Sequence, residues 1–168
     1  PQVGGVDLRI HKCIPVAAGM AGGSTDAAAV LYGMNKLWRL GIPMQRLMEY
    51  GLQIGADVPF CLLRGTALAE GIGEELTSLP PMPGCYVLIA KPPVSVSTKL
   101  VYQTLDALKQ PQHPPIDAQI QDLEAQDLQS LAAHMGNVLE DVTIPMHPQI
   151  TQIKQLMIAQ GALSAMMS

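Results

Sequence analysis

Hydrophobic and polar residues alternate near the start of the chain. Val6, Leu8 and Ile10 are apolar, and the residues between them are polar or charged. Apolar residues at every second position indicate a β-strand with one buried side and one solvent-facing side. We therefore expect a strand over residues 6–11, leading directly into a glycine-rich stretch.

A helical pattern follows that glycine-rich stretch. Apolar residues recur there at the spacing of one face of an amphipathic helix. They are Ala27, Leu31, Met34 and Trp38. Ser24 is the expected N-cap, and Gly41 with Pro43 is expected to end the helix. The pattern thus predicts a strand, a glycine-rich loop and a helix in succession.

Two further elements complete the first half of the chain. A second helix is expected over residues 44–54, ended by Gly55. Its inward side chains would be Leu47, Met48 and Leu52. Residues 61–79 predict one long strand or a hairpin, whose glycines mark bulges or the close approach of a ligand to the backbone.

The proline-rich residues 80–84 are the most plausible boundary between two subdomains. The apolar run 86–90 predicts a buried strand, and Ser97 with Thr98 is expected to cap a short helix.

Helical patterns cover residues 120–135 and 148–160. The inward residues of the second are expected to be Ile150, Ile153, Leu156 and Met157. Residues 162–168 have the composition of the start of a buried strand. Helices and strands in this order predict a mixed α and β fold, with helices packed on sheets.

Composition excludes several classes of protein. Hydrophobic residues make up 48% and charged residues 14% of the 168 residues, so disorder is not expected. The net charge of −4 argues against a nucleic-acid partner, because such binding needs a basic surface. No apolar run reaches the length of a membrane-spanning helix, so we expect no membrane partner.

Cysteine and histidine offer no metal site or disulfide framework. Cys13, Cys61 and Cys85 are widely spaced, and their number is odd. The four histidines show no metal-ligand spacing. Reduced thiols suit a cytoplasmic protein, or the plastid stroma if the source is a plant.

Residues 15–28 form the most distinctive stretch. Glycines leave the backbone free to turn and to approach a ligand, and a helix start offers unpaired N–H groups and a positive dipole end. Both features suit an anion, most often a phosphate, although a loop that merely caps a helix remains open. The spacing of Gly19, Gly22 and Gly23 fits neither the Walker loop, which needs a lysine, nor the dinucleotide fingerprint.

Two acidic residues need an explanation. Asp26 lies in the first turn of the expected helix, where it favours the dipole but would repel a phosphate, so we expect it to point away from the ligand. Asp57 stands alone between Gly55 and a short apolar run. Such an acid is usually a cap or turn residue, and a catalytic role is the alternative.

Residues 15–28 resemble the phosphate loop of the GHMP kinase superfamily. Three other stretches agree with that superfamily in the same order: 55–60, 64–74, and 137–140 followed by Gly161-Ala162. The resemblance covers nearly all of the chain. Met20-Ala21 replace the usual Leu-Gly and Thr25 replaces a serine, and we expect both changes to be mild.

The resemblance implies an α+β fold of two subdomains. A ribosomal-protein-S5-like N-terminal part would carry the glycine-rich phosphate loop over residues 1–80, and a ferredoxin-like part would follow over residues 81–168. The family's Pro-Ala-Lys-x-Asn segment and nearly all of its Gly-Ser-Gly-Pro-Thr loop lie outside these 168 residues. We therefore expect a fold truncated at both ends, and a piece that is inactive or nearly so by itself.

The resemblance also implies transfer of the γ-phosphate of ATP to a hydroxyl of a small molecule. The ATP-binding residues would be Pro15, Ala17, Ala18, Gly19, Met20, Ala21, Gly22, Gly23, Ser24 and Thr25. Asp57 would be the catalytic base and contact the substrate, and Thr25 would ligate Mg²⁺. The remaining substrate-binding residues would be Ile72, Thr98 and Tyr102.

The ending Thr25-Asp26-Ala27-Ala28 is typical of one branch of the superfamily. That branch acts on cytidine diphosphate-linked methylerythritol in non-mevalonate isoprenoid biosynthesis. The alternatives are another small-molecule kinase of the superfamily, or a fragment that binds nucleotide without activity. The sequence does not indicate an oligomeric state.

Overall fold

The computed structural model describes the chain except for ten residues. The described ranges are 4–16, 18–94, 96–107 and 113–168. The chain divides into two compact units, residues 1–79 and 80–168. Within the described ranges, no helix is both long enough and apolar enough to cross a membrane.

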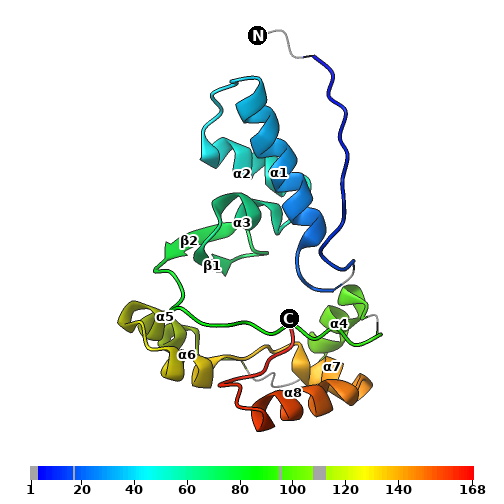
Figure 1. The fold of residues 1–168 in the computed structure, drawn as a ribbon, viewed down its shortest axis with the longest axis vertical. Coiled ribbons are helices and arrows are strands. Elements are labelled where there is room, and N and C mark those ends of the chain that lie inside the picture. The colour runs from blue at the N-terminus through cyan, green and yellow to red at the C-terminus, as the bar shows by residue number, and fades with distance from the viewer. Residues whose placement is uncertain (1–3, 17, 95, 108–112) are drawn as a thin grey trace. The chain divides into compact units, whose positions relative to one another are not determined.

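Within its described ranges, the first unit has three helices and a hairpin (Figure 1). The helices are α1 (Gly22–Leu37), α2 (Met44–Leu52) and α3 (Val58–Leu63). The strands β1 (Thr66–Glu70) and β2 (Glu75–Leu79) pair in antiparallel register. Of the two forms expected for residues 61–79, the structure has the hairpin, although Cys61–Leu63 still belongs to α3.

The core of this unit joins the three helices. Ala28 of α1, Leu47 of α2, and Val58 and Leu62 of α3 are all buried. A Cβ on Gly51 would lie 2.8 Å from Cγ1 of Val58, so a side chain there would push α2 and α3 apart. The absence of a side chain at Gly51 is therefore what lets these two helices approach.

Helix α1 differs from its prediction at both ends. It begins at Gly22 with Ala21 as N-cap, so Ser24 lies inside the first turn and is not the cap. It ends at Leu37, before Gly41 and Pro43. The side chain of Asn35 donates to the carbonyl of Ile42 at 2.9 Å and accepts its N–H at 3.0 Å. These two hydrogen bonds hold the chain in a turn directly after α1, so the helix ends before the glycine and proline that were expected to end it.

Helix α2 also ends early, at Leu52, and the expected range 44–54 was two residues too long. Leu47 is buried and Met48 packs against the core, as expected, but Leu52 is exposed. In the last turn of α2 it is Gly51 that faces α3, and the neighbouring Leu52 is exposed to solvent.

The predicted strands at 6–11, 86–90 and 162–168 are wrong within the described part of the chain, where the sheet has only β1 and β2. The apolar side chains of 6–11 and 86–90 are exposed. Alternation and hydrophobicity express a preference for a strand, but a strand forms only where a second backbone pairs with its N–H and C=O groups. No described segment supplies that partner.

The described residues of the second unit form five helices (Figure 1). They are α4 (Thr98–Leu105), α5 (Ile116–Ala125), α6 (Leu128–His134), α7 (Glu140–Met146) and α8 (Gln149–Ala159). Ser97 caps α4 as predicted, because its hydroxyl accepts the N–H of Leu100 at 3.4 Å.

The single helix expected over 120–135 is two helices. Gln126 adopts a left-handed conformation with φ 55°, which ends α5. Asp127 then caps α6 by accepting the N–H groups of Gln129 at 3.0 Å and Ser130 at 3.1 Å. An aspartate within a helical pattern is the available signal for such a break, because its short carboxylate competes for backbone N–H groups.

The last helix agrees with its prediction, since α8 differs from 148–160 by one residue at each end. Ile150 is buried as expected, but Leu156 is exposed. The C-terminal segment is fixed by polar side chains instead of strand pairing. Asn137 donates to the carbonyl of Met167 at 2.9 Å, and Glu140 accepts the N–H of Met167 at 2.6 Å.

Candidate functional site

The glycine-rich loop lines an open pocket of about 240 Å³ in the first unit. Most of the residues predicted to hold ATP line it. The lining residues are Lys12, Pro15, Val16, Ala18, Gly19, Met20, Ala21, Gly22 and Gly23. Ala17, also predicted to bind ATP, lies outside the described residues. Ser24 and Thr25 follow in the first turn of α1.

Backbone N–H groups at the start of α1 give the pocket its polarity. The first bond of the helix runs from the N–H of Thr25 to the carbonyl of Ala21 at 2.8 Å. The N–H groups of Gly22, Gly23 and Ser24 precede it and have no hydrogen-bond partner among the described residues. Unpaired N–H groups at the positive end of a helix dipole attract an anion.

Ala21 carries backbone strain at this point. Its φ of 47° and ψ of 29° place it in the left-handed region. That conformation costs a residue with a Cβ about 1–2 kcal/mol, whereas glycine adopts it freely. The effect of alanine in place of glycine is therefore not only the added volume of a methyl group. Its Cβ also strains the backbone, because this conformation favours glycine.

A lysine stands beside the loop. The ammonium of Lys12 lies 2.5 Å from Oδ2 of Asp26, and it is 3.4 Å from the position that a Cβ on Gly22 would occupy. The expected place of Asp26 in the first turn is wrong, because α1 begins at Gly22 and Asp26 is its fifth residue; its carboxylate is paired with this ammonium. Lys12 lines the pocket, and the sequence interpretation missed it. A cation three residues before Pro15 was the available signal.

Helix α3 packs against α1 and places Asp57 in the same unit as the loop. Oγ1 of Thr25 lies 3.6 Å from Sγ of Cys61. The N–H of Cys61 donates to the carbonyl of Asp57 at 3.1 Å, so Asp57 is one helical turn from that contact. Asp57 occupies the N-cap position of α3, but its side chain is exposed and makes no capping hydrogen bond.

Ile72 lies at the tip of the hairpin and is 75% exposed. The carboxylate of Glu74 accepts the N–H of Ile72 at 2.6 Å. Gly71 has φ 67°, and a Cβ there would lie 2.7 Å from Oε2 of Glu74. The Glu74 carboxylate thus holds the backbone of the turn, and the side chain of Ile72 is left exposed to solvent.

The other predicted acceptor contacts lie in the second unit. Tyr102 is in α4 and is 51% exposed. Thr98 begins the same helix, and its side chain lies outside what the structure describes. Tyr102 is therefore accessible to a ligand, and it is not buried in the core.

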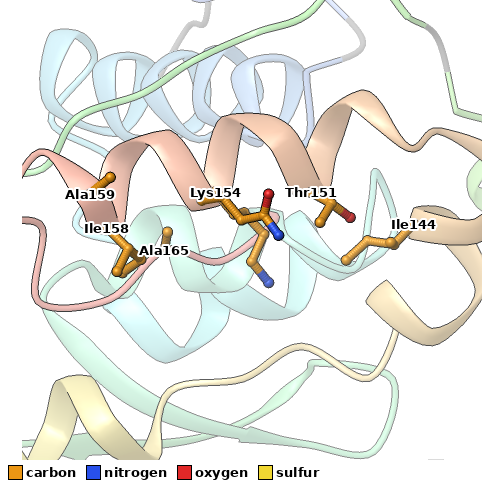
Figure 2. Close-up of a pocket in the computed structure, with 7 residues that line it drawn as sticks. Ile144, Thr151, Lys154, Ile158, Ala159 and Ala165 are labelled. Atoms are coloured by element: carbon orange, nitrogen blue, oxygen red, sulfur yellow. The ribbon is translucent and has the colours of Figure 1, made fainter.

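A larger pocket of about 420 Å³ lies along α8 in the second unit (Figure 2). It is lined by Ile144, Thr151, Lys154, Gln155, Ile158, Ala159 and Ala165. None of the predicted site residues is among them. Its one charged group, the ammonium of Lys154, is paired with Glu140.

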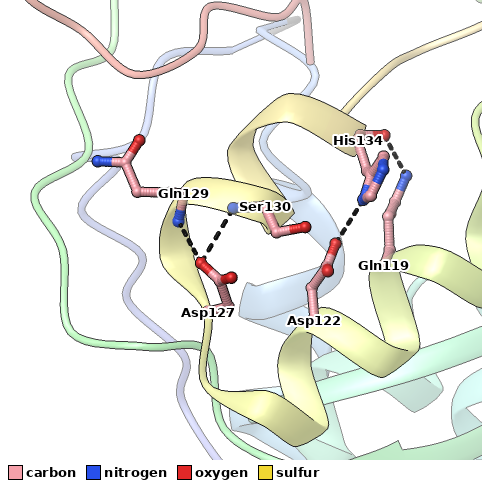
Figure 3. Close-up of polar contacts among 6 residues, drawn as sticks. All are labelled: Gln119, Asp122, Asp127, Gln129, Ser130 and His134. Carbon is pink, nitrogen blue, oxygen red and sulfur yellow. Dashed lines mark hydrogen bonds and ion pairs between the residues drawn. The ribbon is translucent and has the colours of Figure 1, made fainter.

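The second unit also holds a polar cluster (Figure 3). Nδ1 of His134 lies 2.6 Å from Oδ2 of Asp122, and Gln119 donates to the carbonyl of His134 at 2.8 Å. Hydrogen bonds from His134 and then Ser130 lower the pKa of Asp122 from its ordinary value of 3.8. The cluster links α5 to α6 and lies in the unit that does not contain the loop.

Comparison with protein families gives two matches. The GHMP kinase N-terminal domain matches residues 2–65, which include the loop, α1, α2 and α3. The GHMP kinase C-terminal domain matches residues 119–168. The exact domain bounds of 1–80 and 81–168 stay a prediction.

Curated relatives are similar over almost the whole chain. A 4-diphosphocytidyl-2-C-methyl-D-erythritol kinase of Lachnospira eligens is 60% identical over 165 residues, which are 98% of this chain and 57% of the relative. The kinase of the same name from Lachnoclostridium phytofermentans is 55% identical over 98% of this chain and 56% of the relative. The chain thus spans a little over half the length of these relatives.

A solved structure agrees with these relatives. A crystal structure of 4-(cytidine 5'-diphospho)-2C-methyl-D-erythritol kinase matches with a TM-score of 0.66 and 30% identity. The match covers 89% of this chain and 53% of that one. Together with the two family matches and the phosphate-type loop at the start of α1, these similarities show that the chain belongs to the GHMP kinase family.

Proposed function

We propose that the protein carrying this chain is an ATP-dependent kinase that phosphorylates the 2-hydroxyl of 4-diphosphocytidyl-2-C-methyl-D-erythritol. The main support is the loop pocket with its unpaired N–H groups, in a chain 60% identical to a kinase of that name. The proposed role is a step of non-mevalonate isoprenoid biosynthesis.

The loop would bind the phosphates of ATP. The N–H groups of Gly22, Gly23 and Ser24 point from the helix start and have no partner among the described residues. Phosphoryl transfer depends mainly on positioning and charge neutralisation, which backbone donors held in fixed geometry supply. The pocket of about 240 Å³ offers space for phosphate groups beside these donors.

Asp57 would accept or orient the proton of the attacking hydroxyl. Its carboxylate is exposed, in the same unit as the loop and one turn from the contact between Thr25 and Cys61. An ordinary aspartate is a weak base towards an alcohol. Its contribution would therefore be orientation of the hydroxyl and uptake of the proton late in the transfer.

The proposed acceptor contacts are Ile72 in the first unit, and Thr98 and Tyr102 in the second. Ile72 is exposed and Tyr102 is half-exposed, so each by itself offers an accessible surface to a planar base. Apolar and aromatic side chains that remain accessible in this way suit a planar base better than they suit core packing.

Mg²⁺ would neutralise phosphate charge during transfer. Among the described residues, no group of three or more His, Cys, Asp or Glu side chains could hold a metal ion. The exposed hydroxyl of Thr25 is the ligand that this chain would contribute. One protein oxygen is compatible with Mg²⁺, which keeps several waters and binds substrate phosphates.

Acceptor preference tests the proposal. The full-length protein would be assayed with ATP and each of three acceptors: 4-diphosphocytidyl-2-C-methyl-D-erythritol, mevalonate and homoserine. We expect preferential phosphorylation of the cytidylyl compound. Preference for mevalonate or homoserine would assign the protein to another branch of the family, and ATP binding without transfer to any acceptor would favour a binding role.

A further inference from the structure

Two contacts hold the segment before the loop against the start of α1. Cγ2 of Ile14 would lie 3.1 Å from a Cβ on Gly22, so the segment packs where glycine leaves room. Two residues earlier, the ammonium of Lys12 reaches Oδ2 of Asp26 at 2.5 Å. Lys12 also lines the pocket together with Gly19 and Gly22. The ammonium of Lys12 thereby adds a positive charge to the wall of a pocket whose other hydrogen-bond donors are backbone N–H groups.

The charges at this pocket need to be balanced for an anion to enter. Asp26 is the fifth residue of α1, just beyond its first turn, and its carboxylate is paired with the ammonium of Lys12, which lines the pocket. An uncompensated carboxylate there would repel a phosphate, whereas the helix dipole attracts it. Lys12 neutralises this carboxylate, and its ammonium has three N–H donors, of which one suffices for the pair with Asp26.

A purely structural role does not account well for the ion pair between Lys12 and Asp26. The side chains of Lys12 and Asp26 are 35% and 32% exposed, and an ion pair so accessible to water contributes little to folding. The same exposure leaves the ammonium accessible to a ligand in the pocket. Lysine is a common phosphate-binding residue because its charge is compact and its donors rotate freely.

We propose that Lys12 binds the phosphate groups of the nucleotide directly, and that its pairing with Asp26 removes the repulsion that this acid would otherwise exert on them. The inference rests on the proposed function, because it takes the loop pocket to be the nucleotide site. It adds a charged side chain to a site otherwise described by backbone donors.

The test uses the full-length protein with ATP and the cytidylyl acceptor. The variants are Lys12→Met, Lys12→Arg, Asp26→Asn and the double variant Lys12→Met with Asp26→Asn. The control is Lys36→Met, in the last turn of the same helix and over the ring of Tyr32. The measurements are the KM for ATP, kcat, the Kd for ATP without acceptor, and the melting temperature.

Loss of a charge-assisted hydrogen bond predicts that Lys12→Met raises the KM and Kd for ATP about 10- to 100-fold. The kcat should change by less than about threefold, as for a residue that contributes to binding. Lys12→Arg should stay within about threefold of wild type in KM, because the charge is kept. Lys36→Met should leave the KM for ATP unchanged.

The double variant separates phosphate binding from a structural role. With Lys12 removed, Asp26 is left to repel the phosphates, so adding Asp26→Asn should lower the KM for ATP several-fold relative to Lys12→Met alone. Asp26→Asn by itself should stay within about threefold of wild type, since the ammonium remains. A structural ion pair instead predicts equal defects in both single variants and in the double variant.

Two results would overturn the inference. One is a Lys12→Met variant whose KM and Kd for ATP equal those of an active wild type, which would leave the proposed function intact. The other is a double variant no better than Lys12→Met. A wild-type protein that neither binds ATP nor phosphorylates an acceptor would overturn this inference and the proposed function together.

Discussion

Oγ1 of Thr25 lies 3.6 Å from Sγ of Cys61, which joins the first turn of α1 to α3. Cys61 follows Asp57 by one helical turn, and its N–H donates to the carbonyl of Asp57 at 3.1 Å. Thr25 in α1 and the candidate catalytic acid, at the N-cap of α3, therefore belong to two elements that pack directly against each other. They are 32 positions apart in sequence.

Replacement of Asp57 tests its role as the group that accepts or orients the hydroxyl proton. In the full-length protein, Asp57→Asn should lower kcat at least about a hundredfold, because a positioned base typically contributes that much or more. The Kd for ATP should stay unchanged, since the loop donors are untouched. Steady-state kinetics and calorimetric ATP titration measure the two quantities.

The exposed Asp117 provides a matched control, and Asp117→Asn should leave kcat at the wild-type value. An Asp57→Asn variant with wild-type turnover would remove Asp57 from the mechanism.

The left-handed conformation of Ala21 predicts that glycine is preferred at this position. Ala21→Gly should raise the free energy of unfolding by up to about 1 kcal/mol, because the strain of a Cβ at φ 47° exceeds the added backbone entropy of glycine. Chemical denaturation measures the change. Ala29, exposed in the interior of α1, is the control, and Ala29→Gly should lower stability by about 0.5–1 kcal/mol. Changes of the same sign in both variants would contradict the strain at Ala21.

The contact between α2 and α3 predicts opposite effects for two glycines. Gly51→Ala should destabilise the protein by about 1–3 kcal/mol, because its Cβ would lie 2.8 Å from Cγ1 of the fully buried Val58. Gly33→Ala, in α1, has nothing within 4 Å and should stabilise by up to about 1 kcal/mol. Thermal or chemical unfolding of both variants measures this difference, and equal stabilities would show that α2 and α3 are less closely packed at Gly51.

The lowered pKa of Asp122 predicts a pH dependence of stability. Because its pKa in the folded protein lies below the ordinary value of 3.8, the pair with His134 stabilises the fold above that pH. The stabilisation is lost as the pH falls through the folded-state pKa. The difference in free energy of unfolding between wild type and Asp122→Asn should therefore be larger at pH 6 than at pH values below 3.8.

The exposed Glu124 of the same helix is the control for this experiment. Glu124→Gln should show little difference from wild type across the range. A difference between wild type and Asp122→Asn that stays constant from pH 6 downwards would contradict the folded-state shift.

Features determined by neighbouring residues were predictable from the sequence. The helical stripe after the loop, the cap at Ser97 and the extent of α8 depend on periodicity and on local hydrogen bonds, so short patterns specify them. The glycines of the loop left anion binding and helix capping both open, and the resemblance of its motifs to a kinase family, with which the family matches agree, favoured a phosphate loop. Strand segments failed because their pairing needs a partner that no local pattern supplies.

The tertiary structure alone decided which distant side chains meet. Lys12 and Asp26 are 14 positions apart, and their contact depends on how the loop turns between them. Nothing in either local pattern indicated that the lysine before the loop would neutralise the acid after it. The left-handed Ala21 is a further example, because only the start of α1 at Gly22 imposes that conformation. By itself the sequence determined the loop, its helix and the family; packing in three dimensions placed the charges around the loop, because electrostatic contacts depend on distance in space and not on separation along the chain.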